Sequence, residues 1–340
     1  MTQSPPSVLV TGAAGFIGSR FVEACLKKGI PTLNIISVDQ ASHFKTRTEH
    51  QRIAYGPIVD RDQLFDWLKK NNPPLRCVIH MGACSKTTEL DENFLKKVNV
   101  EYSQSIWRYC TEKRIPLIYA SSAATYGAGE MGYNDDETLI PQLKPLNPYG
   151  KSKWLFDLWA LEEEKKGSAP PSWCGLKFFN VYGFGERHKE GQASVVLHAF
   201  DQIQKTGKVK LFRSHRAGIQ DGHQKRDFIS IDDVVNVMDF AMTHPIRRGI
   251  YNLGTDRART FLDLVRAVFA ALKKPEQIEW IDTPEVLRER YQYFTEAKMD
   301  HLRTQGYTPA FTSLETGIQT YVEHLKKELK PGRNSPVEIA

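Results

Sequence analysis

Short apolar runs alternate with amphipathic stretches through the first half of the chain. The runs have the length of strands that are buried on both faces, and the apolar positions between them recur at helical spacing. The predicted strands are 7–12, 32–39, 76–83 and 116–122, and the predicted helices are 16–29, 61–72 and 93–113. Strands and helices that alternate in this way predict an α/β protein with a doubly wound parallel sheet.

The pattern changes in the second half of the chain. A helix is predicted at 150–166, a loop at 167–175 and a strand at 176–183, after which the loops lengthen and the strands become isolated. We therefore expect a sheet domain and a smaller α/β lobe towards the C-terminus, followed by a tail. The predicted ranges are 1–182 with a return at about 225–257 for the sheet domain, 183–330 mainly for the lobe, and 331–340 for a disordered tail.

Composition narrows the function classes. The net charge of +6 is a mild excess over 340 residues, and no Lys/Arg block suggests nucleic-acid binding, so a small anionic substrate fits better. The five cysteines form no CxxC pair and join no histidine cluster, which favours free thiols in a reducing compartment and no metal site. No apolar run is long enough to cross a membrane. The sequence thus predicts a soluble, cytoplasmic protein.

Three glycines follow the first predicted strand and open the first predicted helix. In "VLVTGAAGFIGS", Gly12, Gly15 and Gly18 allow a tight turn and the close approach of a pyrophosphate to the helix N-terminus. This context predicts a Rossmann-type dinucleotide site. Asp39 ends the second strand, where an acid binds ribose hydroxyls and favours NAD, but Lys45 and nearby Arg47 offer a cation for the extra phosphate of NADP. The residues leave the choice between NADP and NAD open.

A candidate catalytic group follows in "ASSAATYG" and "NPYGKSKWLFD". Tyr149 and Lys153 lie four residues apart on one face of a predicted helix, and we expect the cation to lower the pKa of the phenol. Ser122 ends a predicted strand, from which its hydroxyl can bind a substrate oxygen. The three side chains predict a site that exchanges the proton of an alcohol.

The glycines, Ser122 and the YxxxK motif, in this order, resemble the extended short-chain dehydrogenase/reductase family. Within it, "GACSKTTE", "FFNVYG....HK" and "RYQYFTEA" resemble the ADP-glycero-manno-heptose 6-epimerases, from about Val8 to about Tyr321. The resemblance implies an isomerase that inverts the sixth carbon of an ADP-heptose with tightly bound NADP, for lipopolysaccharide core heptose supply. It also implies a homo-oligomer, without nucleic-acid or membrane partners.

The same resemblance implies roles for individual residues. Tyr149 and Lys189 would be the two acid/base groups, assisted by Ser122 and Lys153. The resemblance also implies cofactor contacts beyond the three glycines, Asp39 and Lys45. These are Phe16, Ile17, Gln40, Met81, Gly82, Ala83, Cys84, Ser85, Asn99, Lys153, Val181 and Lys189. The substrate contacts that it implies are Ser122, Asn180, Gly191, His198, Phe212, Arg226 and Tyr291.

Inversion at an unactivated carbon explains a need for two acid/base groups. The hydrogen on the sixth carbon is not acidic, so hydride must leave for the nicotinamide and return to the other face of a transient carbonyl. The alcohol proton then meets a different group in each orientation. Three alternatives stay open: a UDP-hexose 4-epimerase, which needs no Lys189, a 4,6-dehydratase, which would have Asp-Glu in place of Ala123 and Ala124, and a non-catalytic NADP-sensing protein.

Overall fold

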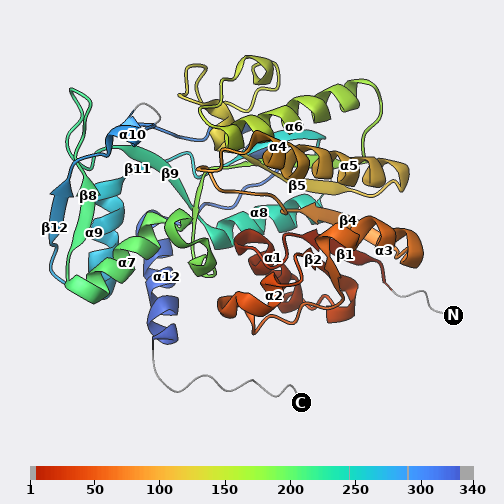
Figure 1. The fold of residues 1–340 in the computed structure, drawn as a ribbon, viewed down its shortest axis with the longest axis horizontal. Coiled ribbons are helices and arrows are strands. Elements are labelled where there is room, and N and C mark those ends of the chain that lie inside the picture. The colour runs from red at the N-terminus through yellow and green to blue at the C-terminus, as the bar shows by residue number, and fades with distance from the viewer. Residues whose placement is uncertain (1–4, 245, 289–290, 330–340) are drawn as a thin grey trace.

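The computed structural model describes residues 5–244, 246–288 and 291–329, and the predicted disordered tail at 331–340 lies outside the described residues. A seven-stranded sheet forms the centre of the molecule, with every neighbouring pair of strands parallel (Figure 1). Its spatial order is β10 (Gly249–Leu253), β6 (Trp173–Phe178), β5 (Leu117–Ser122), β4 (Leu75–His80), β1 (Ser7–Thr11), β2 (Ile35–Asp39) and β3 (Ile58–Asp60). The chain order reverses between β1 and β4, and ligands of doubly wound sheets bind at such a point.

Helices cover both faces of this sheet, which is why its strands are almost wholly apolar. One group is α1 (Phe16–Lys27) and α8 (Ile231–Thr243), which pack on each other. The helix α3 (Leu64–Asn71) follows β3, and its Phe65 meets the ring of Tyr102, in the other group, edge to face. The other group is α4 (Glu92–Leu95), α5 (Tyr102–Glu112) and α6 (Pro148–Lys165). Figure 1 shows α1 with α8 and α5 with α6 on opposite sides of the sheet.

A smaller lobe has a second hydrophobic core, which includes Phe200, Val265 and Ile318. Its strands form a three-stranded sheet, β11 (Ala258–Thr260), β9 (Lys225–Ser230) and β7 (Asn180–Tyr182), and a two-stranded sheet, β12 (Ile278–Ile281) and β8 (Val209–Phe212). Its longer helices are α7 (Val195–Thr206), α9 (Phe261–Leu272) and α12 (Leu314–Glu328). The short helices of the chain include α2 (His43–Thr46), α10 (Glu285–Arg288) and α11 (Asp300–Thr304).

The predicted α/β fold class is confirmed, whereas several predicted boundaries are wrong. The predicted strand 176–183 is two strands, because β6 begins at Trp173 within the predicted loop and ends at Phe178, and β7 joins a different sheet. The predicted helix 93–113 contains a π-helical segment, η4 (Lys96–Glu101), in which Asn99 turns fully inward to bond Cys84. The first residues of the predicted strand 32–39 form a 3-10 turn, η1 (Thr32–Asn34).

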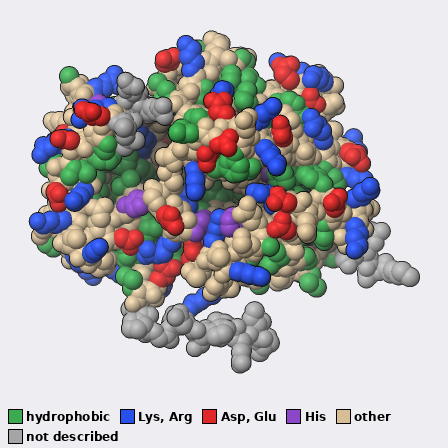
Figure 2. All heavy atoms as spheres, in the orientation of Figure 1, with side chains coloured by type: hydrophobic (Ala, Val, Ile, Leu, Met, Phe, Trp, Pro, Cys, Tyr) green, Lys and Arg blue, Asp and Glu red, His purple; other side chains and the backbone are tan. Residues whose placement is uncertain are grey.

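The surface agrees with the mild net charge. Lys and Arg side chains are interspersed with Asp and Glu over the face in Figure 2 and form no continuous basic patch there. Among the described helices, none combines the length and the hydrophobicity that a bilayer span requires.

Candidate cofactor and catalytic site

The turn between β1 and α1 is shaped for a close ligand. Gly12 has φ of +67°, and a Cβ on Gly18 would lie 2.1 Å from the carbonyl oxygen of Gly12, so both positions require glycine. Gly15 is the N-cap of α1 and supplies no side chain to cap the helix. The backbone N–H groups of the first turn are therefore available to an anion, as a pyrophosphate-binding turn requires.

Asp39 and Arg47 flank this turn on the side of β2. The Asp39 carboxylate accepts a hydrogen bond from the backbone N–H of Ala14, at 3.1 Å, and contacts Nδ1 of His43 at 2.7 Å. Arg47 donates to the carbonyl oxygen of Ala14 at 2.6 Å, and its half-buried guanidinium has a pKa lowered by burial, although Asp39 raises it. Predicted Lys45 is exposed, whereas Arg47 reaches the turn through its bond to Ala14.

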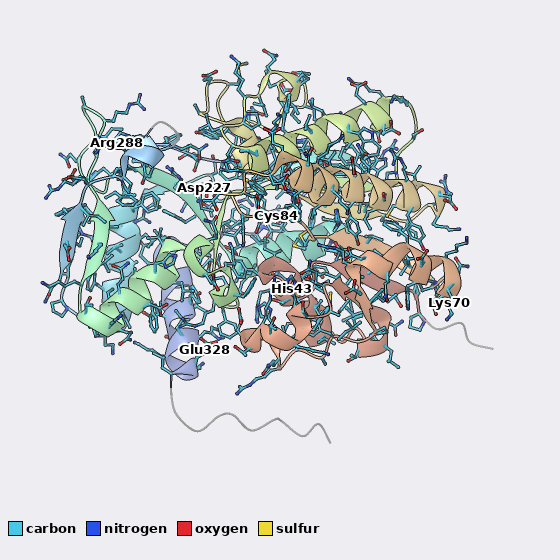
Figure 3. All side chains as sticks on the ribbon, in the orientation of Figure 1. His43, Lys70, Cys84, Asp227, Arg288 and Glu328 are labelled. Atoms are coloured by element: carbon cyan, nitrogen blue, oxygen red, sulfur yellow. The ribbon has the colours of Figure 1, made fainter. Side chains whose placement is uncertain are left out.

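The segment after β4 forms the opposite wall of the turn. The backbone N–H of Gly82 donates to Oγ1 of Thr11, at 3.1 Å, and a Cβ on Gly12 would collide with Gly82. Cys84, near the centre of the molecule in Figure 3, is held by Asn99, whose amide accepts from its N–H and donates to its carbonyl oxygen. Asn99 is thus placed to shape this wall by fixing Cys84.

The remaining predicted cofactor residues vary in burial. Phe16 is buried, Ser85 is exposed, and Ile17, Gln40, Met81, Ala83 and Val181 are half-buried. The glycine turn, its uncapped helix and this wall together fit a dinucleotide.

Three of the four predicted catalytic residues, Ser122, Tyr149 and Lys153, lie at the end of β5 and the start of α6. Asn147 caps α6 by accepting from the N–H of Gly150, and this fixes the first turn of the helix, which carries Tyr149. Burial raises the pKa of Tyr149, and a hydrogen bond with Ser122 lowers it. Lys153 is almost fully buried and donates to the carbonyl oxygen of Ala120 at 2.8 Å.

The expected lowering of the Tyr149 pKa by Lys153 is not observed: burial raises this pKa, and the Lys153 ammonium is directed to the carbonyl oxygen of Ala120. Burial also lowers the pKa of Lys153 to about 8, while Asp157 raises it. The site therefore contains a buried phenol in contact with a serine hydroxyl, and a lysine whose pKa lies below that of free lysine.

Lys189 lies in a different part of the site. It belongs to the turn η7 (Arg187–Gln192), and its ammonium sits 5.4 Å from the centre of the Phe16 ring, at the start of α1. Burial lowers the pKa of Lys189, and the buried carboxylate of Glu186 raises it. The structure thus places Lys189 against the cofactor turn.

Hydrogen bonds from distant segments hold the η7 turn. Glu49 accepts from the backbone N–H of His188 at 2.8 Å and contacts its ring Nδ1 at 2.7 Å, while Gln192 accepts from the Thr87 hydroxyl, on the loop after β4. Although burial opposes it, the His188 hydrogen bond helps to lower the pKa of Glu49 to about 2, so its carboxylate stays charged at neutral pH. This anchoring fixes the residue next to Lys189.

Glu49, His50 and His188 also bring donor atoms within 4.8 Å of one another, the spacing of a metal site. The two ring nitrogens of His50, however, already lie 3.0 Å from the carbonyl oxygen of Ala14 and 2.9 Å from that of Gly185. These contacts connect the glycine turn to the loop that precedes η7. The cluster therefore serves as a structural clamp, which the sequence did not predict.

Replacing Glu49 with Ala removes both contacts to His188, so we expect kcat to fall about 10-fold or more because Lys189 is no longer held in place. Glu49→Gln is the matched control, since its amide oxygen still accepts from the His188 N–H, and it should lose less. Steady-state kinetics and the cofactor content of both variants measure the effect. Equal kcat in Glu49→Ala and the unaltered protein would contradict a positioning role for this anchor.

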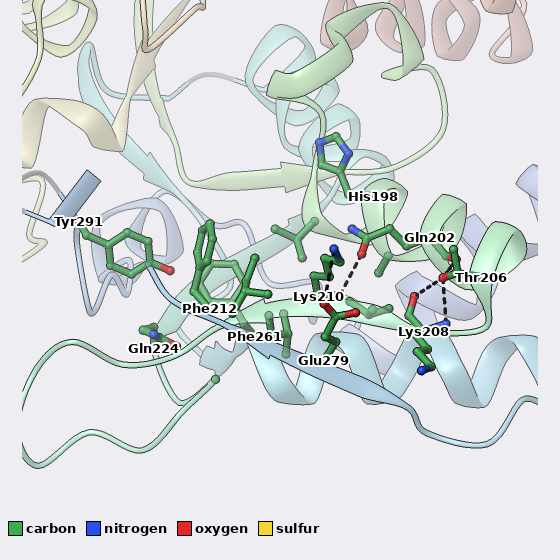
Figure 4. Close-up of a pocket in the computed structure, with 16 residues that line it drawn as sticks. His198, Gln202, Thr206, Lys208, Lys210, Phe212, Gln224, Phe261, Glu279 and Tyr291 are labelled. Atoms are coloured by element: carbon green, nitrogen blue, oxygen red, sulfur yellow. Dashed lines mark hydrogen bonds and ion pairs between the residues drawn. The ribbon is translucent and has the colours of Figure 1, made fainter. Parts of the chain in front are cut away.

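A cavity of about 790 Å³ opens in the smaller lobe (Figure 4). It is mainly apolar, and it collects three of the predicted substrate residues, His198 from α7, Phe212 from β8 and Tyr291. Phe212 and Tyr291 meet edge to face, with ring centres 6.4 Å apart. Flat aromatic walls of this kind suit a nucleotide base.

Other predicted substrate residues lie outside this cavity. Arg226 is buried, lies 5.6 Å from the ring centres of Tyr291 and Phe261, and donates to the carbonyl oxygens of Lys225 and Gln292. The carboxylate of the neighbouring Asp227 accepts bonds from other groups, including the N–H and hydroxyl of Thr255. Asn180 and Gly191 are exposed.

Residues 8–254 match the model of the NAD dependent epimerase/dehydratase family. Because the match spans more than half of the chain, the chain belongs to this family, and it carries the turn for a nicotinamide cofactor.

Relatives in sequence narrow the family further. ADP-L-glycero-D-manno-heptose-6-epimerase of Fusobacterium nucleatum is 46% identical over 332 residues, which covers 94% of this chain and 98% of the relative. The protein of the same name from Nitratidesulfovibrio vulgaris is 45% identical over 316 residues, with coverage of 92% and 96%. The resemblance to heptose epimerases drawn from the sequence motifs is thereby confirmed.

Solved structures agree. The crystal structure of Helicobacter pylori ADP-L-glycero-D-manno-heptose-6-epimerase has a TM-score of 0.77 at 27% identity and covers 94% of this chain and 96% of its own. UDP-N-acetylglucosamine 4-epimerase from Methanobrevibacter ruminantium has a TM-score of 0.79 at 19% identity, with coverage of 96% and 100%, and shares the fold.

Proposed function

We propose that this protein is an isomerase that inverts the sixth carbon of ADP-glycero-manno-heptose. One observation carries the proposal: the buried contact of Tyr149 with Ser122, which ends β5, lies at the same edge of the parallel sheet as the glycine turn that follows β1. The chain shares 46% identity with a relative named as this epimerase. A phenol and a serine hydroxyl that converge can bind one alcohol oxygen and exchange its proton. The site thus has the groups that reversible oxidation of an alcohol requires.

The chain's own residues divide the work. Ser122 orients the substrate oxygen, Tyr149 accepts or returns its proton, and the Lys153 ammonium lies one helical turn from Tyr149. A nicotinamide dinucleotide, whose pyrophosphate the glycine turn would hold, would supply a group that takes the hydride and gives it back, so the net redox change would be zero. Return of the hydride to the opposite face of the carbonyl would invert the carbon.

Lys189 is proposed as the second acid/base group. Its burial and lowered pKa support this role, since an amine that gives up its proton more readily than free lysine exchanges protons more effectively near neutral pH. Its position over Phe16 supports a simultaneous contact with the cofactor. The nucleotide of the substrate is assigned to the cavity lined by Phe212 and Tyr291. Its diphosphate is assigned to Arg226, which lies next to the Tyr291 ring.

We further propose NADP as the cofactor, supported by the Arg47 guanidinium beside the turn, in place of the predicted Lys45. A cytoplasmic homo-oligomer that supplies heptose for lipopolysaccharide completes the proposal and is supported by the resemblance to the heptose epimerases. Mass spectrometry of cofactor released from the purified protein distinguishes NADP from NAD, and light scattering gives the oligomer size.

The deciding experiment supplies the purified protein with one ADP-heptose epimer and follows the other by proton NMR. We expect interconversion without added cofactor and without net reduction of nicotinamide. UDP-galactose is the parallel substrate, because the alternative 4-epimerase function uses Ser122, Tyr149 and Lys153 as well. If the protein converted UDP-galactose and left ADP-heptose unchanged, the heptose assignment would be wrong and the 4-epimerase function would take its place.

A further inference from the structure

Four consecutive residues of β5 bind the catalytic face of α6. Tyr119 donates from its hydroxyl to Oδ1 of Asp157 at 3.1 Å, and Ser121 donates to Oδ2 at 2.6 Å. Between them, the carbonyl oxygen of Ala120 accepts from Lys153. The next residue, Ser122, bonds Tyr149. Asp157 thus lies on the same face of α6 as Tyr149 and Lys153, one helical turn after Lys153.

Asp157 also forms a fully buried ion pair with β6. Nζ of Lys177 lies 2.7 Å from Oδ2 of Asp157, and both side chains are 0% exposed. The same ammonium donates to Oγ1 of Thr125 at 2.7 Å, and Thr125 in turn bonds the carbonyl oxygen of Ser122. A charged pair in a core costs desolvation energy that an apolar pair would avoid. The proton-exchange function proposed above does not use this pair.

We propose that Asp157, held by Lys177, is a positioning residue that keeps the Lys153 ammonium charged and in place against β5. The geometry supports this, because the same β5 segment holds both residues and they lie on one face of α6. The Asp157 carboxylate lies on the same helix as Lys153, and its negative charge offsets part of the desolvation cost of burying the Lys153 ammonium. The inference rests on the proposed function, since it assigns a role to Lys153 in that reaction.

The charges around Lys153 give the direction of this effect. Burial lowers the pKa of Lys153, whereas Asp157 on α6 raises it, with a further contribution from Cys84, which follows β4. His80 on β4 is neutral, because burial lowers its pKa to about 3, with a smaller effect of Lys153. Tyr149 is a buried phenol on the same helix, and its raised pKa keeps it neutral when free. Asp157 is therefore the carboxylate that favours the ammonium form of Lys153.

The test compares two ways of removing the carboxylate charge. Asp157→Asn leaves the Lys177 ammonium unpaired in the core, so the double variant Asp157→Asn/Lys177→Met, which removes both charges, guards against failure to fold. We expect the alkaline limb of the kcat/KM profile, where Lys153 loses its proton, to move down by about one pH unit in Asp157→Asn. In the double variant it should move down by less, because the Lys177 cation is lost as well. Asp233→Asn, which removes a buried carboxylate that accepts bonds from Thr312, is the matched control and should leave the limb in place.

A direct titration separates this inference from the proposed function. Protein labelled with ¹³C at lysine Cε reports the protonation of Lys153 by NMR, with Lys153→Met to assign the signal, and needs no substrate. We expect the Lys153 midpoint to fall in the double variant and to stay unchanged in Asp233→Asn. An unchanged midpoint in a folded double variant would overturn the role of Asp157. Inactivity of the unaltered protein on ADP-heptose would instead overturn the proposed function.

Discussion

Replacing Tyr149 with Phe will reduce epimerisation by about 10² to 10⁴-fold, because the phenol oxygen that exchanges the substrate proton is lost. The ring is buried, and Phe fills the same space, so the fold and the cofactor content should be retained. Single-turnover kinetics with cofactor-loaded protein measure the loss at the chemical step. The unchanged circular dichroism spectrum and the absorbance of the bound nicotinamide serve as controls.

A second variant distinguishes the loss of the Tyr149 phenol from the loss of its hydrogen bond with Ser122. Ser122→Ala removes the hydrogen bond to Tyr149 and keeps the phenol, so a smaller loss is expected than in Tyr149→Phe. If Tyr149→Phe retained most of the activity, a different residue would have to exchange the proton.

Replacing Lys189 with Met will reduce turnover by about 10²-fold or more, since one of the two orientations of the transient carbonyl then lacks its acid/base group. Met has a side chain of similar length and removes only the ammonium that lies over Phe16, so the glycine turn should remain intact. The measurement is kcat in both directions of epimerisation, together with the cofactor content of the purified variant.

The position of Lys189 over the cofactor turn makes the cofactor measurement decisive. Loss of turnover with full cofactor content supports the acid/base role. Loss of turnover that added cofactor restores would assign Lys189 to cofactor binding alone. Lys151→Met, which removes an exposed lysine paired with Glu92, is the matched control and should have normal activity.

The parts of the site that follow from local chemistry were predictable from the sequence. The glycine turn was predictable because its spacing depends on local backbone geometry alone. The shared face of Tyr149 and Lys153 was predictable because residues four apart on a helix lie on the same face. The strand after "APPSWCG" was misplaced because its boundaries depend on which neighbours it pairs with: β6 lies between β5 and β10, whereas β7 pairs with β9.

The residues that hold the site in place could not be predicted in the same way. The contact between Glu49 and His188 joins positions 139 residues apart, and only the folded chain brings them together. The pair formed by Asp157 and Lys177 did leave a trace, since Lys177 is a single charge within an apolar run. The sequence does not identify the partner of Lys177, however. A lysine in this position could equally mark the end of a strand or form a buried ion pair.

The place of β10 in the central sheet has a consequence for the integrity of the chain. This strand comes after the first half of the smaller lobe, yet it pairs with β6 along five residues, from Gly249 to Leu253. A chain cut at residue 182 would therefore leave β6 as an edge strand with unpaired backbone groups and a fully buried sequence that is apolar except for Lys177. We expect such a fragment to aggregate, so truncation at residue 182 should not give a stable cofactor domain. The central sheet can be completed only after β10 is synthesised, almost 70 residues after position 182.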